Sequence, residues 1–382
     1  MSNTLTGLIP VLFQACDIVS RELTGMIPAV TINADAENAA KDQTITYPIT
    51  PASSAVNIAP GVTAPDAGDQ TMGYDSLSIS KARAVPIRWN GEEIVSLGSM
   101  HGRLLVDQFA QAMRTLTNEV EADLANLYVA ASRAYGTAGT TPFATAGDFT
   151  DASEVRRILV DNGAPISDLQ LVLDTAAGSS IRGKQAQAQI NGDAVLQRQG
   201  ILHSLAGMAI RESGQIAYQT KGTASSATTT AAGFALGTTS LALASAGTGT
   251  LLAGDVVTFA GDTTNKYVVT TGDTDVSNGG TLVIGKPGLK VAMSAATKAI
   301  TVGASFRANM AFARSAIHLV ARTPAMPPGG DMADDVLYLT DPVSGLVFQI
   351  ALYRQYRQIK YEVGLAWGVK AVKPEHIAIL LG

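Results

Sequence analysis

Residues 103–133, RLLVDQFAQAMRTLTNEVEADLANLYVAASR, show the most regular pattern in the 382-residue chain. Apolar residues recur there every three or four positions, which is the period of an α-helix with one buried face. At 1.5 Å per residue such a helix would extend about 45 Å, whereas the average globular helix has only about 11–12 residues. We therefore expect one long spine helix against which other elements pack. Its apolar positions are Leu105, Phe109, Ala112, Met113, Leu116, Val120, Leu124, Leu127 and Ala131.

Two predicted strands precede this helix, with a long polar segment between them. Residues 42–50 alternate polar and apolar, and residues 75–89 form a second, less regular strand. The segment that joins them is rich in Pro and Gly, and a loop of this length is unusual inside a compact domain. We therefore expect a hairpin that is functional or that leaves its own domain to lie on something else. Residues 1–41 predict an irregular arm with one short helix.

The chain after the helix divides by composition into three parts. Residues 151–215 alternate predicted helices and strands, which is typical of a mixed α/β block. They include a short apolar strand at 169–173 and helices at 175–190 and 193–199. Residues 221–304 are rich in Thr, Ala, Gly and Val and contain no Arg, His, Trp or Glu. Their short apolar segments, separated by Gly, Asp and Asn turns, predict a small β-barrel or sandwich. Because the earlier pattern resumes in residues 305–382, which end in predicted strands, we expect residues 221–304 to be an inserted domain.

The charge of the chain argues against several classes of protein. The net charge is −5, and the chain lacks the basic excess of a nucleic-acid-binding protein. Charged residues make up 15%, below the usual quarter, which suits a surface covered by neighbouring subunits or a plain β-rich domain. The first 80 residues are acidic and residues 354–373 are basic. The two parts could meet between subunits, or each could be a solvated face.

Local motifs for chemistry are lacking in the sequence. It has no P-loop and no G-x-S-x-G elbow, and its four histidines lack the spacing of paired metal ligands. The single cysteine, Cys16, lies on the apolar side of a predicted helix and is expected to be buried and inert. Without a signal peptide or a run of about 18 apolar residues, we expect a cytoplasmic protein with no membrane span. We predict no catalytic residue, no cofactor and no metal site.

Acidic residues occur in groups that have two possible roles. Glu92 and Glu93 are adjacent at a predicted turn between the hairpin and the spine helix, and three more acids lie on that helix. Paired carboxylates can perform acid–base chemistry or hold a divalent cation, but solvated faces and intersubunit ion pairs are far commoner. Between subunits, Glu92 and Glu93 could meet Arg83 or Arg88 of a neighbour. The acids on the helix are Glu119, Glu121 and Asp123.

The order of elements resembles the major capsid protein of tailed bacteriophages, whose fold is shared with herpesvirus shells. Two stretches carry most of the resemblance. AGDVVTFAG, residues 253–261, is similar to a strand of the β-barrel inserted in the coat proteins of short-tailed phages, and VGLAWGVKAVKPEHIAILLG, residues 363–382, is similar to the family's C-terminal sequences. The chain is shorter than well-known members of this subgroup, and its N-terminal arm is brief.

The resemblance implies an α+β fold with five parts. These would be an N-terminal arm (1–41), an extended hairpin loop (42–98), a spine helix with the α/β peripheral and axial core (99–220), the inserted β-barrel (221–304) and a β-rich return to the core (305–382). The hairpin loop would reach over an adjacent subunit. Asp273 and Asp275, in a loop of the inserted domain, would be candidates for contacts between neighbours, although an ordinary solvated turn is the alternative.

The same resemblance implies a non-catalytic protein that self-assembles into an icosahedral virion shell around double-stranded DNA. Its partners would be copies of itself in hexamers and pentamers, a portal, and a separate scaffolding protein, since only about 40 residues precede the hairpin. Packaged DNA would contact its lumenal side non-specifically, and assembly would take place in the bacterial cytoplasm. The alternatives are an encapsulin-like cage, an α/β enzyme without a local motif, and a secreted β-rich adhesin, which would need a signal peptide.

Overall fold

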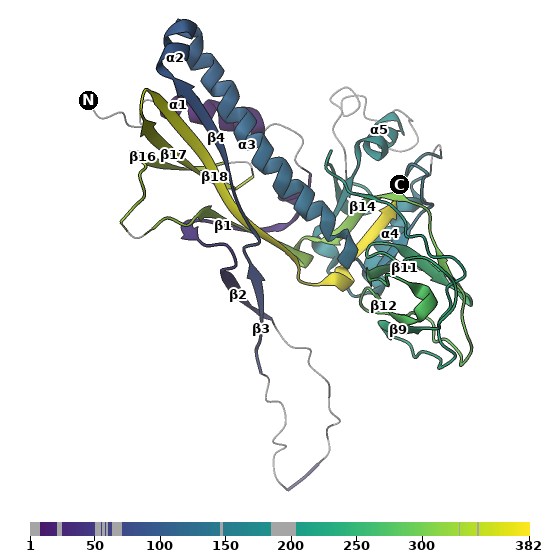
Figure 1. Cartoon of the computed structure of the whole chain (residues 1–382). Coiled ribbons are helices and arrows are strands. Elements are labelled where there is room, and N and C mark those ends of the chain that lie inside the picture. The colour runs from purple at the N-terminus through teal and green to yellow at the C-terminus, as the bar shows by residue number, and fades with distance from the viewer. Residues whose placement is uncertain are drawn as a thin grey trace.

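The computed structural model describes residues 8–20, 25–49, 55, 58, 60–62, 71–145, 148–184, 204–327, 329–341 and 344–382. Figure 1 shows two lobes and a projection: a long sheet with helix α3 along one face, a second lobe that contains the C-terminus, and a narrow hairpin that leaves the base of the first lobe. We call these the sheet lobe, the α/β lobe and the arm, and this arm is distinct from the N-terminal arm expected at residues 1–41.

Helix α3 (His101–Ala125) is the spine that the periodicity predicts. Its 25 residues extend roughly 38 Å, and the predicted apolar positions within it are buried. The helix ends earlier than expected, because Asn126–Ala130 form the 3-10 turn η4. Side chains three residues apart still share a face in a 3-10 turn, so the apolar pattern continues past the end of the α-helix. Helix α2 (Gly91–Leu97) and turn η3 (Gly98–Met100) come before α3, where we expected only a turn.

The sheet lobe is built on a six-stranded sheet. Strand β18, the longest, pairs with β4 on one edge and with β17 and β15 along the other. Helix α1 (Ile9–Ser20) packs with α3, and the two helices share one large hydrophobic core with this sheet. The strands are β1 (Thr31–Ala39), β15 (Ile317–Pro324), β18 (Gln358–Ala371), β17 (Val347–Gln355), β16 (Asp335–Thr340) and β4 (Lys81–Asn90).

The expectation of an irregular N-terminal arm is wrong for β1. This strand pairs with β15 in parallel through residues such as Ile32 and Leu319, and the register shifts between Ala34 and Asn38. Its sequence, TINADAENA, alternates poorly and contains two acidic residues, so it carries no clear strand signal. Strand β1 forms because it pairs with β15, which is distant in the sequence. Such a long-range contact leaves no pattern in the local sequence of the strand.

The arm is a separate two-stranded sheet, β2 (Thr44–Ile49) with β3 (Gly73–Ser78). The single strand expected at 75–89 is therefore two strands, β3 and β4, in two different sheets. The chain changes partner at Ile79, which is fully buried, and at Ser80, whose N–H donates to the carbonyl of Trp367 at 3.0 Å. Most of the predicted loop between β2 and β3 lies outside the described residues.

The α/β lobe contains the larger sheet, with strand order β13-β10-β11-β5-β19-β14-β6-β7. Helices α4 (Thr150–Asp161) and α5 (Thr175–Lys184) belong to this lobe, and a second hydrophobic core lies between them and the strands. A predicted helix at 193–199 lies outside the described residues. The strands are β5 (Arg133–Tyr135), β6 (Leu169–Leu173), β7 (Met208–Glu212), β8 (Tyr218–Gln219), β10 (Val256–Phe259), β11 (Asp262–Thr271), β13 (Ile300–Val302), β14 (Phe306–Ala313) and β19 (Ile377–Leu381).

Residues 221–304 contain strands β9 (Ser240–Leu243), β10, β11, β12 (Gly280–Ile284) and β13. Each is paired with the next in the order β9-β12-β11-β10-β13. Isolated bridges from Thr228 to Ala299 and from Thr229 to Leu243 connect the two ends of this series, so the pairings form a closed ring around their own hydrophobic core. Strand β11 also pairs with β5, which joins the ring to the large sheet.

Candidate assembly surfaces

The arm exposes apolar side chains that a folded monomer would normally cover. Ile58 and Val62 are fully exposed, Tyr74 is 75% exposed, and Met72 is 48% exposed. A lone two-stranded hairpin is marginally stable in water, so an arm of this kind gains order mainly from what it contacts. At its base the arm is held closely, since a Cβ on Gly368 of β18 would overlap the carbonyl oxygen of Ser78.

A second surface lies at the tip of the sheet lobe, where α2 meets the turn between β17 and β18. Asn90 and Glu93 form a capping box, each side chain accepting the backbone N–H of the other residue, and this fixes the start of α2. Across from α2, Arg357 takes a left-handed conformation with φ 55°, and its carbonyl accepts the N–H of Gly91 at 3.0 Å. Two-residue hairpin turns require such positive φ values.

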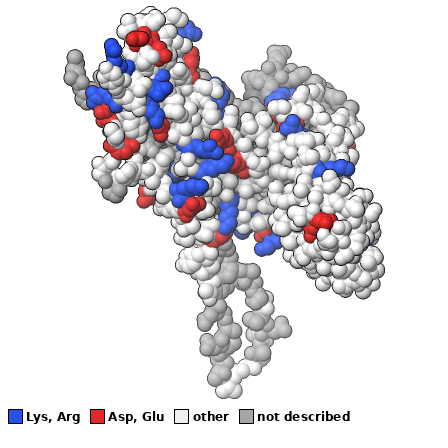
Figure 2. Space-filling model, viewed as in Figure 1, with Lys and Arg blue, Asp and Glu red and all other residues white. Residues whose placement is uncertain are grey.

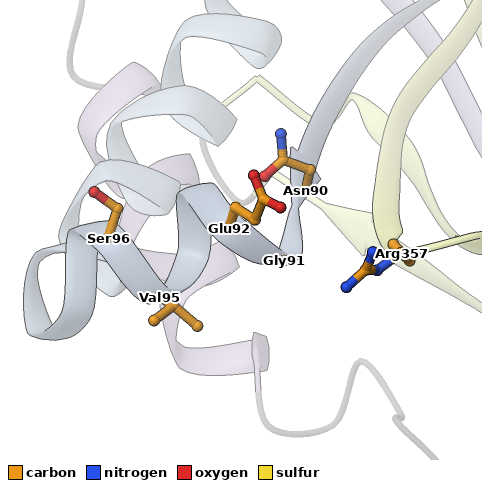
Figure 3. A pocket seen from close by; sticks show the side chains of 6 residues that line it. All are labelled: Asn90, Gly91, Glu92, Val95, Ser96 and Arg357. Atoms are coloured by element: carbon orange, nitrogen blue, oxygen red, sulfur yellow. The ribbon is translucent and has the colours of Figure 1, made fainter.

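These elements border an open hollow of about 660 Å³ at the tip. Figure 3 shows Arg357 across the hollow from Asn90 and Glu92. Val95, which lines the hollow, is 81% exposed. Nearby along the chain, Met100 of η3 is 65% exposed and Tyr356, next to Arg357, is 89% exposed. A charged pair of opposite sign beside exposed apolar groups is a surface that suits a protein partner. The sequence did not predict this surface, whose exposed residues are Val95, Met100, Tyr356 and Arg357. Only the turn between β17 and β18 could have indicated that Tyr356 and Arg357 are exposed.

A third surface is a shallow trough of about 220 Å³ that β4, β17 and β18 line together with the segment after β15. Small residues, Ala82, Ala84 and Gly364, leave room between the strands, and Tyr353 and Glu362 also line the trough. The trough was not predicted, because small residues that come together from separate strands leave no local pattern.

The predicted contact residues on the sheet lobe are not brought together within one chain. Arg83 reaches α3 and lies 3.6 Å from Glu119. Arg88 is exposed beside Lys360, its register partner on β18. Glu92 lines the hollow at the tip, whereas Glu93 is used by the capping box. Of the two adjacent acids, Glu92 is therefore the one whose carboxylate is available for contact with a partner.

The remaining predicted contacts lie in a turn of residues 272–279. The backbone of Asp273 forms a β-bridge with Leu251, and its carboxylate accepts the N–H of Asp275. The carboxylate of Asp275 accepts the N–H and the hydroxyl of Ser277 and so caps turn η6 (Val276–Asn278). These hydrogen bonds lower the pKa of Asp275. Both carboxylates are engaged in local turn structure, which is the alternative role that the sequence left open.

The prediction of a solvated acidic face on the spine helix is wrong for Glu121, which is 1% exposed. Its carboxylate accepts the N–H of Met26 at 3.0 Å, the N–H of Ile27 at 2.8 Å and the hydroxyl of Ser213 at 2.8 Å. Burial raises the pKa of Glu121, while these hydrogen bonds oppose the shift. Asp123 is also engaged within the chain, because it accepts from Lys81 and from the indole of Trp367.

One acidic residue of the N-terminal part and one basic residue of the C-terminal part meet within one chain at the base of the arm. There Asp75 pairs with Lys370 at 2.5 Å. Figure 2 shows the charged side chains gathered over the sheet lobe and sparse over the ring of residues 221–304, which contain neither Arg nor Glu. On the face shown in Figure 2, the sheet lobe is therefore the part whose charged side chains can distinguish one binding partner from another.

The described histidines lie in packed positions. His101 meets the ring of Trp89 edge-on at 5.3 Å, His318 stacks on Tyr47, and His376 is buried. Burial lowers the pKa of His318 and that of His376. His203 lies outside the described residues, and Cys16 is buried as predicted. In the part of the chain that the structure describes, no group of three or more His, Cys, Asp or Glu could hold a metal ion. No described helix is long and apolar enough to cross a membrane.

No family model and no curated protein matches the chain. Solved structures do match. The capsid structure of cyanophage P-SCSP1u is 11% identical with a TM-score of 0.48, and the match covers 92% of this chain and 86% of that one. A structure from Mycobacterium phage Che8 is 14% identical with a TM-score of 0.43, covering 90% and 85%. A virus-like particle from Pyrococcus furiosus is 8% identical with a TM-score of 0.44, covering 98% and 99%.

Because Glu92 is exposed, a substitution there can test whether the tip contacts a partner without unfolding the chain. We expect Glu92→Lys to impair assembly while lowering the free energy of unfolding by only about 1 kcal/mol, because Glu92 is exposed and loses only the favourable interaction of an acidic side chain with the first turn of α2. Sedimentation velocity and chemical denaturation measure the two quantities. The matched control is Asp107→Lys, a charge reversal at an exposed position of α3. Normal assembly of Glu92→Lys would remove the tip from the candidate contacts.

Proposed function

We propose that the chain is the major capsid protein of a tailed bacteriophage, a non-catalytic subunit that self-assembles into an icosahedral shell around double-stranded DNA. The arm carries this proposal. It leaves the body as a separate two-stranded sheet and presents the fully exposed side chains of Ile58 and Val62. Exposed apolar groups of this kind mark a contact with another protein. A second copy of the chain is the partner that is always available at the same concentration.

The five parts of the chain then have distinct roles. Within residues 1–41, helix α1 and strand β1 belong to the sheet lobe. Of residues 42–98, the arm is the part that lies on an adjacent subunit, whereas β4 and α2 belong to the sheet lobe. In residues 99–220, the spine helix belongs with the six-stranded sheet to a peripheral domain, and the α/β lobe is the axial domain that meets itself around the shell's symmetry axes. Residues 221–304, the closed ring of strands, are an inserted β-barrel on the outer surface, and residues 305–382 complete the core.

The trough between β4, β17 and β18 is the surface that we assign to a neighbour's arm. Its small residues leave room for a chain laid across the strands. Arg83 lines the trough, and Arg88 is exposed further along β4. The two acids that also line the trough are already engaged, Asp331 by Tyr353 and Glu362 by Lys360. The segment between β2 and β3 contains Asp66 and Asp69 but no basic residue. Complementary charge of this kind fixes the register of two partners and speeds their encounter more than it adds affinity. Each contact can be weak, because a closed shell repeats it many times.

The proposed partners beyond the shell follow from the same assignment. A separate scaffolding protein and a portal would act during assembly in the bacterial cytoplasm. The lumenal side would touch packaged DNA non-specifically, in keeping with a net charge of −5 that offers no strong attraction to phosphate. The mature protein would be located in the virion.

Expression of the full chain, alone and together with its neighbouring viral genes, tests the proposal. We expect closed shells of uniform size when the neighbours are present, and polyheads or spirals when the chain is alone, because scaffolding would set the curvature. Sedimentation and negative-stain electron microscopy distinguish these products. Soluble monomers under both conditions would overturn the proposal, whereas closed cages that enclose a protein cargo in place of DNA would identify an encapsulin-like container.

A further inference from the structure

Two cross-strand pairs face each other where the arm leaves the body. On the arm, Tyr47 of β2 is the register partner of Asp75 of β3. On the six-stranded sheet, His318 of β15 is the register partner of Lys370 of β18. These four residues, here called the clasp, come from four strands in two separate sheets.

Both sides of the clasp are in contact. The Lys370 ammonium donates to Asp75 Oδ1 at 2.5 Å and to the carbonyl of Ser76 at 2.8 Å, and the Tyr47 hydroxyl donates to Asp75 Oδ2 at 3.1 Å. The rings of Tyr47 and His318 stack with centroids 5.1 Å apart and planes at 25°. Asp75 is thus shared between an arm residue and a body residue. The Lys370 hydrogen bond lowers the pKa of Asp75, and burial with the Asp75 hydrogen bond raises the pKa of Tyr47 to about 12.

The clasp lies between the buried base of the arm and its exposed part. On the body side of it, Leu77 and Ile79 are buried, and Ile79 clusters with Ala39 and Ala366. On the tip side, Tyr74 and Met72 are exposed. The clasp therefore lies at the boundary between the anchored base and the projecting part of the arm.

Two contacts side by side restrain the arm more than their separate strengths suggest. A partly exposed ion pair contributes little stability by itself, and one stacked ring pair is a modest contact. Placed on the two neighbouring strands of the arm, however, they hold both strands to the body. The arm can then neither twist about its length nor swing about residues 79–80 without breaking one of them.

We propose that the clasp is a conformational lock that sets the direction of the arm in the unassembled chain, and that its release lets the arm swing. The arm's task of covering a neighbour rests on the proposed function. The direction of the arm does not, because it is a property of one chain and is measurable without assembly. An arm held in one direction reaches a neighbour at a lower entropic cost than a freely moving one.

Distances between two spin labels test the lock on the full chain, with unassembled protein isolated by gel filtration. One label is placed on the arm by Met72→Cys and the other on the tip by Tyr356→Cys, in a Cys16→Ala background. We expect one narrow distance distribution for the chain with an intact clasp. In Lys370→Met that narrow peak is expected to be lost to a broad distribution. Lys370→Arg, which keeps the cation, is expected to retain the peak.

The matched control is Lys373→Met, which removes an exposed cation two residues beyond the end of β18 and should leave the peak narrow. Asp75→Asn is the second test variant, because it removes the ion pair while keeping the size of the side chain, and it should broaden the distribution as Lys370→Met does. Circular dichroism verifies that each variant is folded. A narrow, unshifted peak in a folded Lys370→Met or Asp75→Asn variant would overturn the lock. Failure of shell assembly with an intact narrow peak would instead contradict the proposed function.

Discussion

Replacement of Trp367 by alanine is expected to lower the free energy of unfolding by about 3–5 kcal/mol, the usual cost of truncating a buried large aromatic side chain. Trp367 is fully buried in the middle of β18 and belongs to the core shared by the sheet lobe and its helices. Its indole N–H donates to Asp123 of α3 at 2.8 Å. The substitution therefore leaves a cavity and also removes a tie between the sheet and the spine helix.

Urea denaturation followed by circular dichroism measures the loss of stability. Tyr356→Ala, the same kind of truncation at an 89% exposed position, is the control and should change stability by less than about 0.5 kcal/mol. A Trp367→Ala variant as stable as this control would mean that the sheet and α3 do not share one core.

The elements that were predicted correctly are those whose pattern is set by local periodicity. The spine helix has a continuous apolar face, and its nine predicted core positions are buried or, for Leu127, half-buried. Strand β6 is a short apolar run and was predicted at 169–173, where it is found. Such patterns require only that one face of an element meets the core, and they do not depend on which element covers it.

Elements that depend on a distant partner were not predicted. Strand β1 is formed by pairing with β15, nearly 300 residues later, and the strand expected at 75–89 is divided because Ser80 pairs with Trp367. The hollow at the tip unites α2 with the turn of β17 and β18. Which strands become neighbours is a property of the fold, and no single segment carries that information.

Ionisable residues were the least predictable part of the candidate site. Glu119 and Glu121 lie two positions apart on one helix, yet the first pairs with Arg83 at the surface and the second is buried. Helical periodicity places Glu121 one position after the core residue Val120, at the border of the apolar face, where either environment is possible. The deciding factor is a set of backbone N–H groups at residues 26 and 27, which the sequence does not place near α3.

Replacement of Glu121 by alanine is expected to destabilise the chain by about 3–5 kcal/mol, because buried donors that lose their acceptor cost roughly 1–3 kcal/mol each. The donors are the N–H groups of Met26 and Ile27 and the hydroxyl of Ser213, and all three residues are nearly inaccessible to solvent. The carboxylate connects the segment before β1, the C-terminal end of α3 and the end of β7. Chemical denaturation measures the loss, and Glu119→Ala on the exposed side of the helix is the matched control.

The pH dependence of this effect has a defined sign. Burial raises the pKa of Glu121 in the folded chain above its unfolded value of about 4.3, so the folded chain binds more protons than the unfolded chain between the two values. The contribution of Glu121 to stability is therefore fully present below about pH 4.3 and decreases as the pH rises through the raised pKa. Glu121→Gln cannot titrate, so the stability of the parent chain relative to this variant should fall over that window. A difference that stays constant with pH would show that hydrogen bonds from the two backbone N–H groups and from Ser213 fully compensate the burial of the charge.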